Sequence, residues 1–197
     1  MISSRAPGKL FIAGEYAVVE PGHLAVLTAV DRYATATVTV ADPGEAITLA
    51  SDLDGGVTLS CERHGDELVP TSDTVVPANL SYVFAAVSVV HRLLVERAIP
   101  VSSFRLSVTA DLGDADGRKF GLGSSAAVTV ATVAALGQHF ALGLSLMDRY
   151  RLAMLATIVV NPRASGGDVA VSTWGGWLAY RSPDRAQVAA SLGRDGV

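Results

Sequence analysis

The chain has 197 residues and a formal net charge of −4, and its charges are scattered along the sequence. Nucleic-acid binding is therefore not expected, because it requires lysine and arginine gathered on one surface. Mean hydropathy is +0.39, yet no run approaches the ~20 apolar residues of a membrane span, so no membrane partner is expected. No secretion signal opens the chain, and the single cysteine, Cys61, excludes an internal disulfide. These features indicate a cytoplasmic protein with a sizeable core.

The first half of the chain is rich in short strands separated by turns. Thr35–Val40 alternates threonine with alanine or valine, the period of a half-buried strand. Pro21-Gly22 is a strong turn signal. The predicted strands are Lys9–Ala13, Ala17–Val19, Thr35–Val40, Ala46–Leu49 and Val57–Ser60.

Helical spacing begins at Asn79 and continues to a stop before Pro100. Further helices are expected from Ser124 or Ser125 to about Phe140, over Leu146–Val159 and over Pro183–Leu192. Phe104–Thr109 and Trp177–Tyr180 are predicted strands, Asp111–Lys119 and Asn161–Asp168 loops, and Val169–Thr173 a helix or strand. Strands that come early and then mix with helices indicate an α+β fold in place of a doubly wound sheet.

The segment with the strongest chemical signal is Lys119-Phe-Gly-Leu-Gly-Ser-Ser-Ala-Ala127, which leads into an alanine- and valine-rich helix. Glycines allow close approach of an anion to backbone N–H groups, and the helix that follows adds its positive dipole end. Serine hydroxyls there can cap the helix, bind phosphate or ligate Mg²⁺. A Gly-Ser turn that only caps a packed helix is the alternative.

Two other segments carry candidate polar groups. Lys9 opens an apolar strand that is followed by Gly14-Glu15-Tyr16, and a lysine suits a phosphate or developing negative charge. Asp168 follows two glycines and precedes an apolar run, where a carboxylate could accept or orient a hydroxyl. Taken singly, the Pro-Gly-Lys segment is more often a structural turn, and an aspartate such as Asp168 is more often a helix N-cap.

Together the three segments resemble the GHMP superfamily of small-molecule kinases. Pro7-Gly8-Lys9 with Gly14-Glu15 is similar to the superfamily's first motif, and Gly121–Ala127 to its phosphate-binding motif. The lysine-led loop and Ser165-Gly-Gly-Asp168 most resemble the phosphomevalonate kinase branch. The resemblance implies the N-terminal domain fold of these kinases, which is like domain 2 of ribosomal protein S5, over residues 1–197.

The resemblance also implies a reaction, in which ATP with Mg²⁺ phosphorylates phosphomevalonate to diphosphomevalonate in isoprenoid precursor synthesis. Lys9 and Asp168 would be catalytic. The residues expected to bind the ATP phosphates are Lys119, Gly121, Leu122, Gly123, Ser124, Ser125 and Ala126. Ser125 would ligate Mg²⁺, and Glu15, Tyr16 and His23 would contact the substrate. Arg118, Arg163 and Lys119 could offset the repulsion between two phosphate groups, with solvated arginines as the alternative.

Two departures from the superfamily pattern limit the prediction. Residues Ala156–Val160 contain no counterpart of the Mg²⁺-binding glutamate of mevalonate kinases, which favours the phosphomevalonate branch or weakens metal binding. GHMP kinases also have a C-terminal domain with a further glycine-rich motif, and the sequence contains no such motif. A separate C-terminal half is therefore an expected partner. Another GHMP kinase activity, such as mevalonate kinase, and a non-catalytic ligand-binding fragment remain alternatives.

Overall fold

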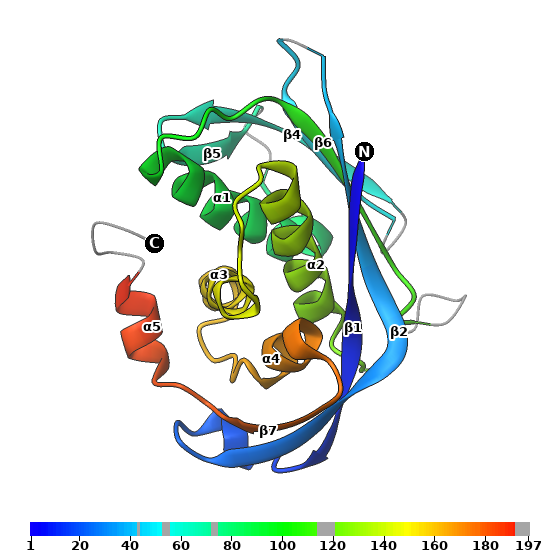
Figure 1. Cartoon of the computed structure of the whole chain (residues 1–197), viewed down its shortest axis with the longest axis vertical. Helices are drawn as coiled ribbons and strands as arrows, with labels where there is room; N and C mark the ends of the chain where they lie inside the picture. The colour runs from blue at the N-terminus through cyan, green and yellow to red at the C-terminus, as the bar shows by residue number, and fades with distance from the viewer. Residues whose placement is uncertain (43, 53–55, 72–74, 114–120, 192–197) are drawn as a thin grey trace.

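A seven-stranded sheet curves around a group of helices (Figure 1). The computed structural model describes residues 1–42, 44–52, 56–71, 75–113 and 121–191. The strands are β1 (Ile2–Ala13), β2 (Leu24–Val40), β3 (Ile47–Ser51), β4 (Val57–His64), β5 (Glu67–Pro70), β6 (Phe104–Ala110) and β7 (Trp177–Arg181). The helices are α1 (Ser81–Glu96), α2 (Ser124–His139), α3 (Leu146–Val160), α4 (Gly167–Trp174) and α5 (Arg185–Ser191), with short 3₁₀ turns η1 (Ala17–Val19) and η3 (Ala78–Leu80).

The long strand β2 organises the sheet. It pairs with β1 over almost its whole length, with β7 along its first residues and with β6 along its last. The strand order is β1-β2-β6-β3-β4-β5, and every pair is antiparallel except β3 with β6. Segregated helices on a largely antiparallel sheet confirm the predicted α+β class.

Helix α2 lies at the centre of the helical layer. Every residue from Ala126 to Gly137 is buried, so the helix has no solvent-facing stripe. Small side chains allow it to pack closely against β1, β2, α1, α3 and α4. A helix that is apolar all round is stable only inside a core, and this burial fixes where its N-terminus lies.

A second, smaller group of buried side chains holds the start of β2, β7 and α4 together. Its members are Val18, Ala25, Leu27, Ala170, Val171 and Tyr180. Because Ala170 and Val171 belong to α4, this cluster anchors the short helix to the sheet. The position of Asp168, in the first turn of α4, therefore depends on packing with β2 and β7.

Most predicted elements are present, with shifted ends. One prediction was wrong: Ala17–Val19 forms the 3₁₀ turn η1 instead of a strand. Gly14 has φ +80°, and its carbonyl accepts a hydrogen bond from Val18 N at 2.9 Å, so the chain coils locally. The residues before Lys9, the first half of β2 and all of β5 were not predicted, because their side chains alternate less regularly and cross-strand pairing supplies the order.

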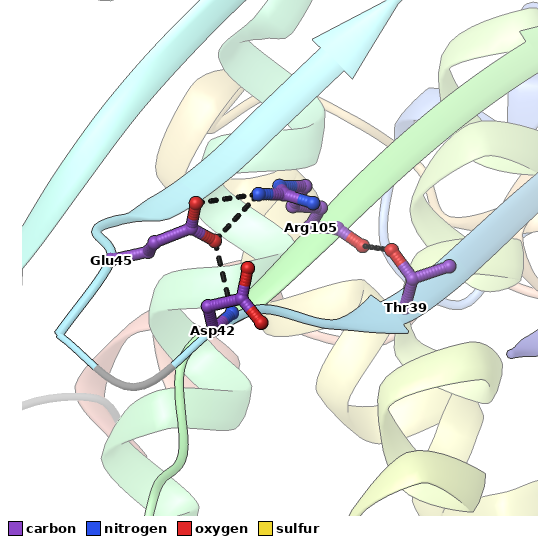
Figure 2. A network of polar contacts seen from close by, with 4 residues as sticks. All are labelled: Thr39, Asp42, Glu45 and Arg105. Carbon is purple, nitrogen blue, oxygen red and sulfur yellow. Dashed lines mark hydrogen bonds and ion pairs between the residues drawn. The ribbon is translucent and has the colours of Figure 1, made fainter.

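Arg105 of β6 fastens the end of β2 to the segment that leads to β3 (Figure 2). Its Nη2 donates to both carboxylate oxygens of Glu45 at 2.6 Å, and Glu45 also accepts a hydrogen bond from Asp42 N at 3.0 Å. Thr39 Oγ1 donates to the Arg105 carbonyl at 3.5 Å. These contacts close a turn at the surface of the sheet.

One helical segment, Ala78–Glu96, has the length and hydropathy of a membrane span, with 19 residues and a mean hydropathy of 1.5. Its buried side chains, among them Val83, Val87 and Leu94, belong to the main core. This burial is typical of a core helix in a soluble domain, so the segment gives only weak evidence of a membrane.

Cys61 is also buried in the core, and burial raises the pKa of its thiol to about 11. An inert structural cysteine fits that environment.

Candidate active site

Lys9 of β1 contacts the glycine-rich loop that precedes α2 through both its backbone and its side chain. Its backbone N donates to the carbonyl of Leu122 at 2.8 Å, and its Nζ donates to the carbonyl of Gly121 at 3.0 Å. Gly8 allows this approach, since a β-carbon there would lie 2.8 Å from the Leu122 oxygen. The two hydrogen bonds hold the loop against the end of β1.

These contacts also orient the loop's N–H groups. The described peptide bonds are all trans, so each N–H points away from the carbonyl of its own peptide unit. Because the Gly121 and Leu122 carbonyls face Lys9, the N–H groups of Leu122 and Gly123 point to the opposite side. Gly123 has φ +74° and is the N-cap of α2 without a side-chain cap. The first-turn N–H groups of a 16-residue helix thus remain available to an anion.

Gly123 lies between Lys9 and Asp168. A β-carbon built on it would be 2.9 Å from Cγ and 3.1 Å from Cε of Lys9, and 3.6 Å from Cβ of Asp168. The structure therefore brings together the three segments singled out in the sequence. A lysine and a carboxylate meet beside the open N-terminus of a buried helix.

Asp168 sits on α4, which is tied to β1 close to Lys9. Ser172 Oγ donates to the Pro7 carbonyl at 2.8 Å, and Asp168 Oδ1 accepts from Val169 N at 2.9 Å. Gly166, with φ +81°, begins the helix without a side-chain cap. The glycines before Asp168 allow the sharp turn that brings its carboxylate to the phosphate loop.

Burial raises the pKa of the Asp168 carboxyl above its ordinary value of 3.8. The hydrogen bond from Val169 N and the positive charge of Lys9 oppose that rise without cancelling it. Asp168 is half-buried by surface area, and a half-buried carboxylate that faces a cation is a common feature of catalytic sites. Because burial disfavours the ionised carboxylate, the position of Asp168 lowers the stability of the fold, and capping a helix does not explain it.

Tyr82, in the first turn of α1, is part of this site and was missed by sequence reasoning. Burial is the largest cause of a raised pKa for its hydroxyl, and the charge of Asp168 adds to the rise. A hydrogen bond with the Ser125 side chain lowers the pKa of the Tyr82 hydroxyl and so opposes part of this rise. Tyr82 thus connects the phosphate loop with the carboxylate. The one signal in the sequence was the position of Tyr82 near the start of a predicted helix, which does not by itself predict a site residue.

The other predicted site residues differ in where the structure places them. Ser124 and Ser125 are half-buried in the first turn of α2, and Ala126 is buried behind them. Glu15, Tyr16 and His23 are exposed, with Tyr16 88% exposed. They lie around η1. Arg185 of α5 donates to the carbonyl of Val19, the last residue of η1, and Arg181 of β7 donates to the Gly22 carbonyl at 3.1 Å. Lys119 and Arg118 lie outside the described residues, and Arg163 is exposed at the end of α3.

Oxygen donors for a metal ion are sparse at the site. Within the part of the chain that the structure describes, no group of three His, Cys, Asp or Glu side chains comes together. The stretch Ala156–Val160 lies at the end of α3 and has no carboxylate. The hydroxyls of Ser124 and Ser125 and the Asp168 carboxylate are the side-chain oxygens near the loop that could contact a metal ion. This set fits Mg²⁺ held mainly by water and substrate phosphates, with few protein ligands.

Comparison with known proteins finds GHMP kinases, the superfamily whose motifs resemble the segments that contain Lys9, Gly123 and Asp168. The family model of the GHMP kinases N-terminal domain matches residues 81–176. In a structural comparison, the phosphomevalonate kinase of Streptococcus pneumoniae, solved in complex with phosphomevalonate and AMPPNP, has a TM-score of 0.82 and 28% identity. That match covers 98% of this chain and 54% of the other. The chain is therefore similar to the N-terminal half of GHMP kinases, with the family model matched over residues 81–176.

Individual relatives refine this assignment. The chain is 50% identical, over its full length, to 54% of the phosphomevalonate kinase of Streptomyces sp. (strain CL190). It is 33% identical, over 89% of its length, to 49% of the mevalonate kinase of Aeropyrum pernix. The chain therefore spans about half the length of the curated relatives it matches, and its sequence is nearer to the phosphomevalonate kinase than to these mevalonate kinases.

Proposed function

We propose that this chain is the N-terminal, ATP-binding domain of a phosphomevalonate kinase, comprising residues 1–197. The observation that carries the proposal is the position of Gly123, in the phosphate loop, between Lys9 and Asp168. The 50% identity to a phosphomevalonate kinase supports the choice of substrate. The reaction would convert phosphomevalonate to diphosphomevalonate at the expense of ATP, in the mevalonate pathway of isoprenoid synthesis, in the cytoplasm.

The loop and the N-terminus of α2 would bind the ATP phosphates. The N–H groups of Leu122 and Gly123 face away from Lys9 and, with the uncapped first turn of α2, could donate to phosphate oxygens. Gly121 and Ala126 are small residues that would not obstruct a phosphate. Ser124 and Ser125 would add hydroxyl donors, with Ser125 as a ligand of Mg²⁺. The ion would neutralise charge on the transferred group. Lys119 would add positive charge at the same loop.

Lys9 and Asp168 would act on the acceptor oxygen. The acceptor is a phosphate monoester, whose second ionisation has a pKa of about 6, so most acceptor groups carry no proton at neutral pH. Asp168 would then serve chiefly to orient the acceptor and Lys9, and would take a proton only from the minority that retain one. Lys9 would stabilise the charge of the in-line transfer, a reaction that depends mainly on positioning.

A substrate contact is proposed for Glu15, Tyr16 and His23 because their exposed side chains surround η1. We propose that a C-terminal half completes the site, as the relatives are about twice as long as the chain. Arg163 and Arg118 are candidates for neutralising the second phosphate group, with Lys119.

The test measures binding and turnover separately. Calorimetry with ATP and Mg²⁺ should show binding to the 197-residue chain, and Gly123→Ala should weaken it. ADP release is then followed with phosphomevalonate, mevalonate or homoserine as acceptor, with Asp168→Ala and the exposed Asp31→Ala as a matched pair. Any turnover should be fastest with phosphomevalonate, and of the two variants only Asp168→Ala should abolish it.

The outcomes separate the alternatives. Equal or faster turnover of mevalonate would assign the chain to the mevalonate kinase branch, which its 33% identity to such an enzyme makes the second candidate. ATP binding without ADP release would show that this chain alone is a non-catalytic nucleotide-binding domain. Failure to bind ATP at all would refute the phosphate-loop assignment.

A further inference from the structure

Two tyrosine hydroxyls form a hydrogen-bonded chain that ends on the loop before α4. Tyr180 Oη donates to the Ser165 carbonyl at 2.8 Å. Tyr150 Oη lies 2.9 Å from Tyr180 Oη. Because a phenol has one proton and Tyr180 uses its own on Ser165, Tyr150 is the donor of that second bond. The order is thus Tyr150 to Tyr180 to the backbone of Ser165.

The carbonyl of Ser165 receives a second donor from the same direction. Ser182 Oγ, just beyond β7, donates to it at 3.2 Å and lies 3.4 Å from a second acceptor, the Pro183 carbonyl, so its one proton is shared. Tyr180 and Ser182 are both buried, so the two bonds are shielded from competing water. The loop is therefore attached to β7 by two bonds that converge on one backbone atom.

The next residue, Gly166, is fitted closely to this chain. A β-carbon there would lie 2.7 Å from Tyr180 Oη and 2.5 Å from Met154 Sδ. Gly166 is also the N-cap of α4 and lacks a side-chain cap. The start of α4 is therefore oriented by contacts of Gly166 with Tyr180 and α3, together with a long hydrogen bond of 3.4 Å from Gly167 N to Ser165 Oγ.

Asp168 follows two residues later, and its own side-chain bond is to the adjacent Val169 N. That bond moves with the helix and does not fix the carboxylate relative to Lys9. Besides the apolar packing of Ala170 and Val171, side-chain hydrogen bonds among the described residues attach α4 and the loop before it to the rest of the fold: Ser172 to Pro7, and Tyr180 and Ser182 to Ser165. Displacement of the Ser165 carbonyl would turn the first residues of α4, with the carboxylate among them.

We propose that Tyr180, supported by Tyr150, is a positioning residue that holds the Asp168 carboxylate in its buried place beside Lys9. The functional importance of this rests on the proposed role of Asp168 in phosphoryl transfer. The competing explanation is a tyrosine pair that stabilises the core without affecting the carboxylate. The two explanations differ in what happens to Asp168 when a hydroxyl is removed.

The experiment uses Tyr180→Phe and Tyr150→Phe, which remove one hydroxyl each and keep the ring. The Asp168 carboxyl is titrated by carbon NMR in both variants and in the wild-type chain, without nucleotide. Near-ultraviolet circular dichroism checks the fold. In Tyr180→Phe we expect the Asp168 pKa to fall towards 3.8, since a loosened helix start admits water and burial is the main cause of its rise.

The matched variant should give a smaller effect in the same direction. Tyr150→Phe removes the support of Tyr180 but leaves the bond to Ser165 intact. Amide hydrogen exchange at Gly167 and Val169 should quicken by about tenfold in Tyr180→Phe and less in Tyr150→Phe. A common loss of thermal stability with an unchanged Asp168 titration in both variants would overturn the proposal.

A substitute variant and a measurement of kinase activity complete the test. If Tyr180→Phe does not fold, Ser182→Ala removes the longer bond to the same carbonyl, and the Asp168 titration in that variant decides the question. The carboxyl titration needs no turnover, so a chain without kinase activity can still confirm the positioning role. Kinase activity that is lost in Asp168→Ala but unchanged in a folded Tyr180→Phe would support the proposed function and refute the inference.

Discussion

The ammonium group of Lys9 donates a hydrogen bond to the backbone carbonyl of Gly121 at 3.0 Å, across 112 residues of sequence. The bond gives Lys9 two tasks. It holds the phosphate loop so that the following N–H groups point away from β1, and it keeps a positive charge beside Asp168. A ligand phosphate that approached Lys9 would compete with the Gly121 carbonyl for the same ammonium protons.

Gly123→Ala should weaken ATP binding and destabilise the domain more than an equivalent change elsewhere. A non-glycine residue at φ +74° costs about 1–2 kcal/mol, and crowding against Lys9 adds about 1–3 kcal/mol. Gly143→Ala is the matched control, since it has φ +63° with open space around the new methyl group. Chemical denaturation and calorimetry measure the two effects. Equal losses of stability would show that Lys9 yields to the methyl group.

Asp168→Asn should abolish turnover and make the domain more stable at neutral pH. Because burial raises the pKa of Asp168 in the folded state, ionisation of this carboxyl costs stability once the pH rises above 3.8. The variant lacks that cost, so its melting temperature should exceed that of the wild type at pH 7 and match it below pH 3.8. Calorimetric melting over this pH range measures the difference.

Asp148→Asn is the opposite case and serves as its control. Hydrogen bonds from Ser145 lower the pKa of Asp148, so its carboxylate adds stability above pH 3.8 that is lost as the pH falls through the folded pKa. The variant should melt at a lower temperature than the wild type at pH 7. A gain of stability in both variants would instead indicate relief of general negative charge.

His91 should make the domain less stable under mildly acidic conditions. Burial is the main cause of its lowered pKa, with Arg63 adding to the decrease while the Gly65 carbonyl and Asp66 oppose it. Folding therefore favours the neutral ring, and stability falls as the pH drops below 6.5 towards the folded pKa.

His91→Gln should flatten this dependence, since the amide can replace Nε2 in the 3.2 Å contact with Gly65. His64→Gln, at an exposed position, is the matched histidine control. Denaturation from pH 8 to 5 measures all three proteins, and a flat wild-type profile would contradict the prediction.

Glu45→Gln should have little effect on stability despite the short contacts in Figure 2. The Arg105 and Glu45 side chains are 52% and 39% exposed, and exposed ion pairs contribute about 0–1 kcal/mol. Denaturation at low and high salt should show a small loss that salt removes. A large loss that salt does not change would mean that the Asp42 N–H contact, and not the charge, closes the turn.

The sequence predicted α2 and its glycine-rich entrance well because both depend on local properties. A long run of small apolar residues after Gly123-Ser124 specifies a buried helix and an anion-binding N-terminus. The α+β class followed from the order of strands and helices. The strand at Ala17–Val19 was wrong because a three-residue apolar run has no pairing information of its own, and Gly14 coils it.

By itself, the sequence indicated the three segments that hold the proposed site residues, since glycine, lysine and aspartate have recognisable local roles. Only the tertiary structure decided how they meet: β1 and α4 lie far apart in the chain, and packing against α2 sets their contact. The same packing places Tyr82 and Tyr180 near Asp168. Their positions in the sequence do not predict this, because hydrogen bonds between distant segments depend on the folded core and not on neighbouring residues.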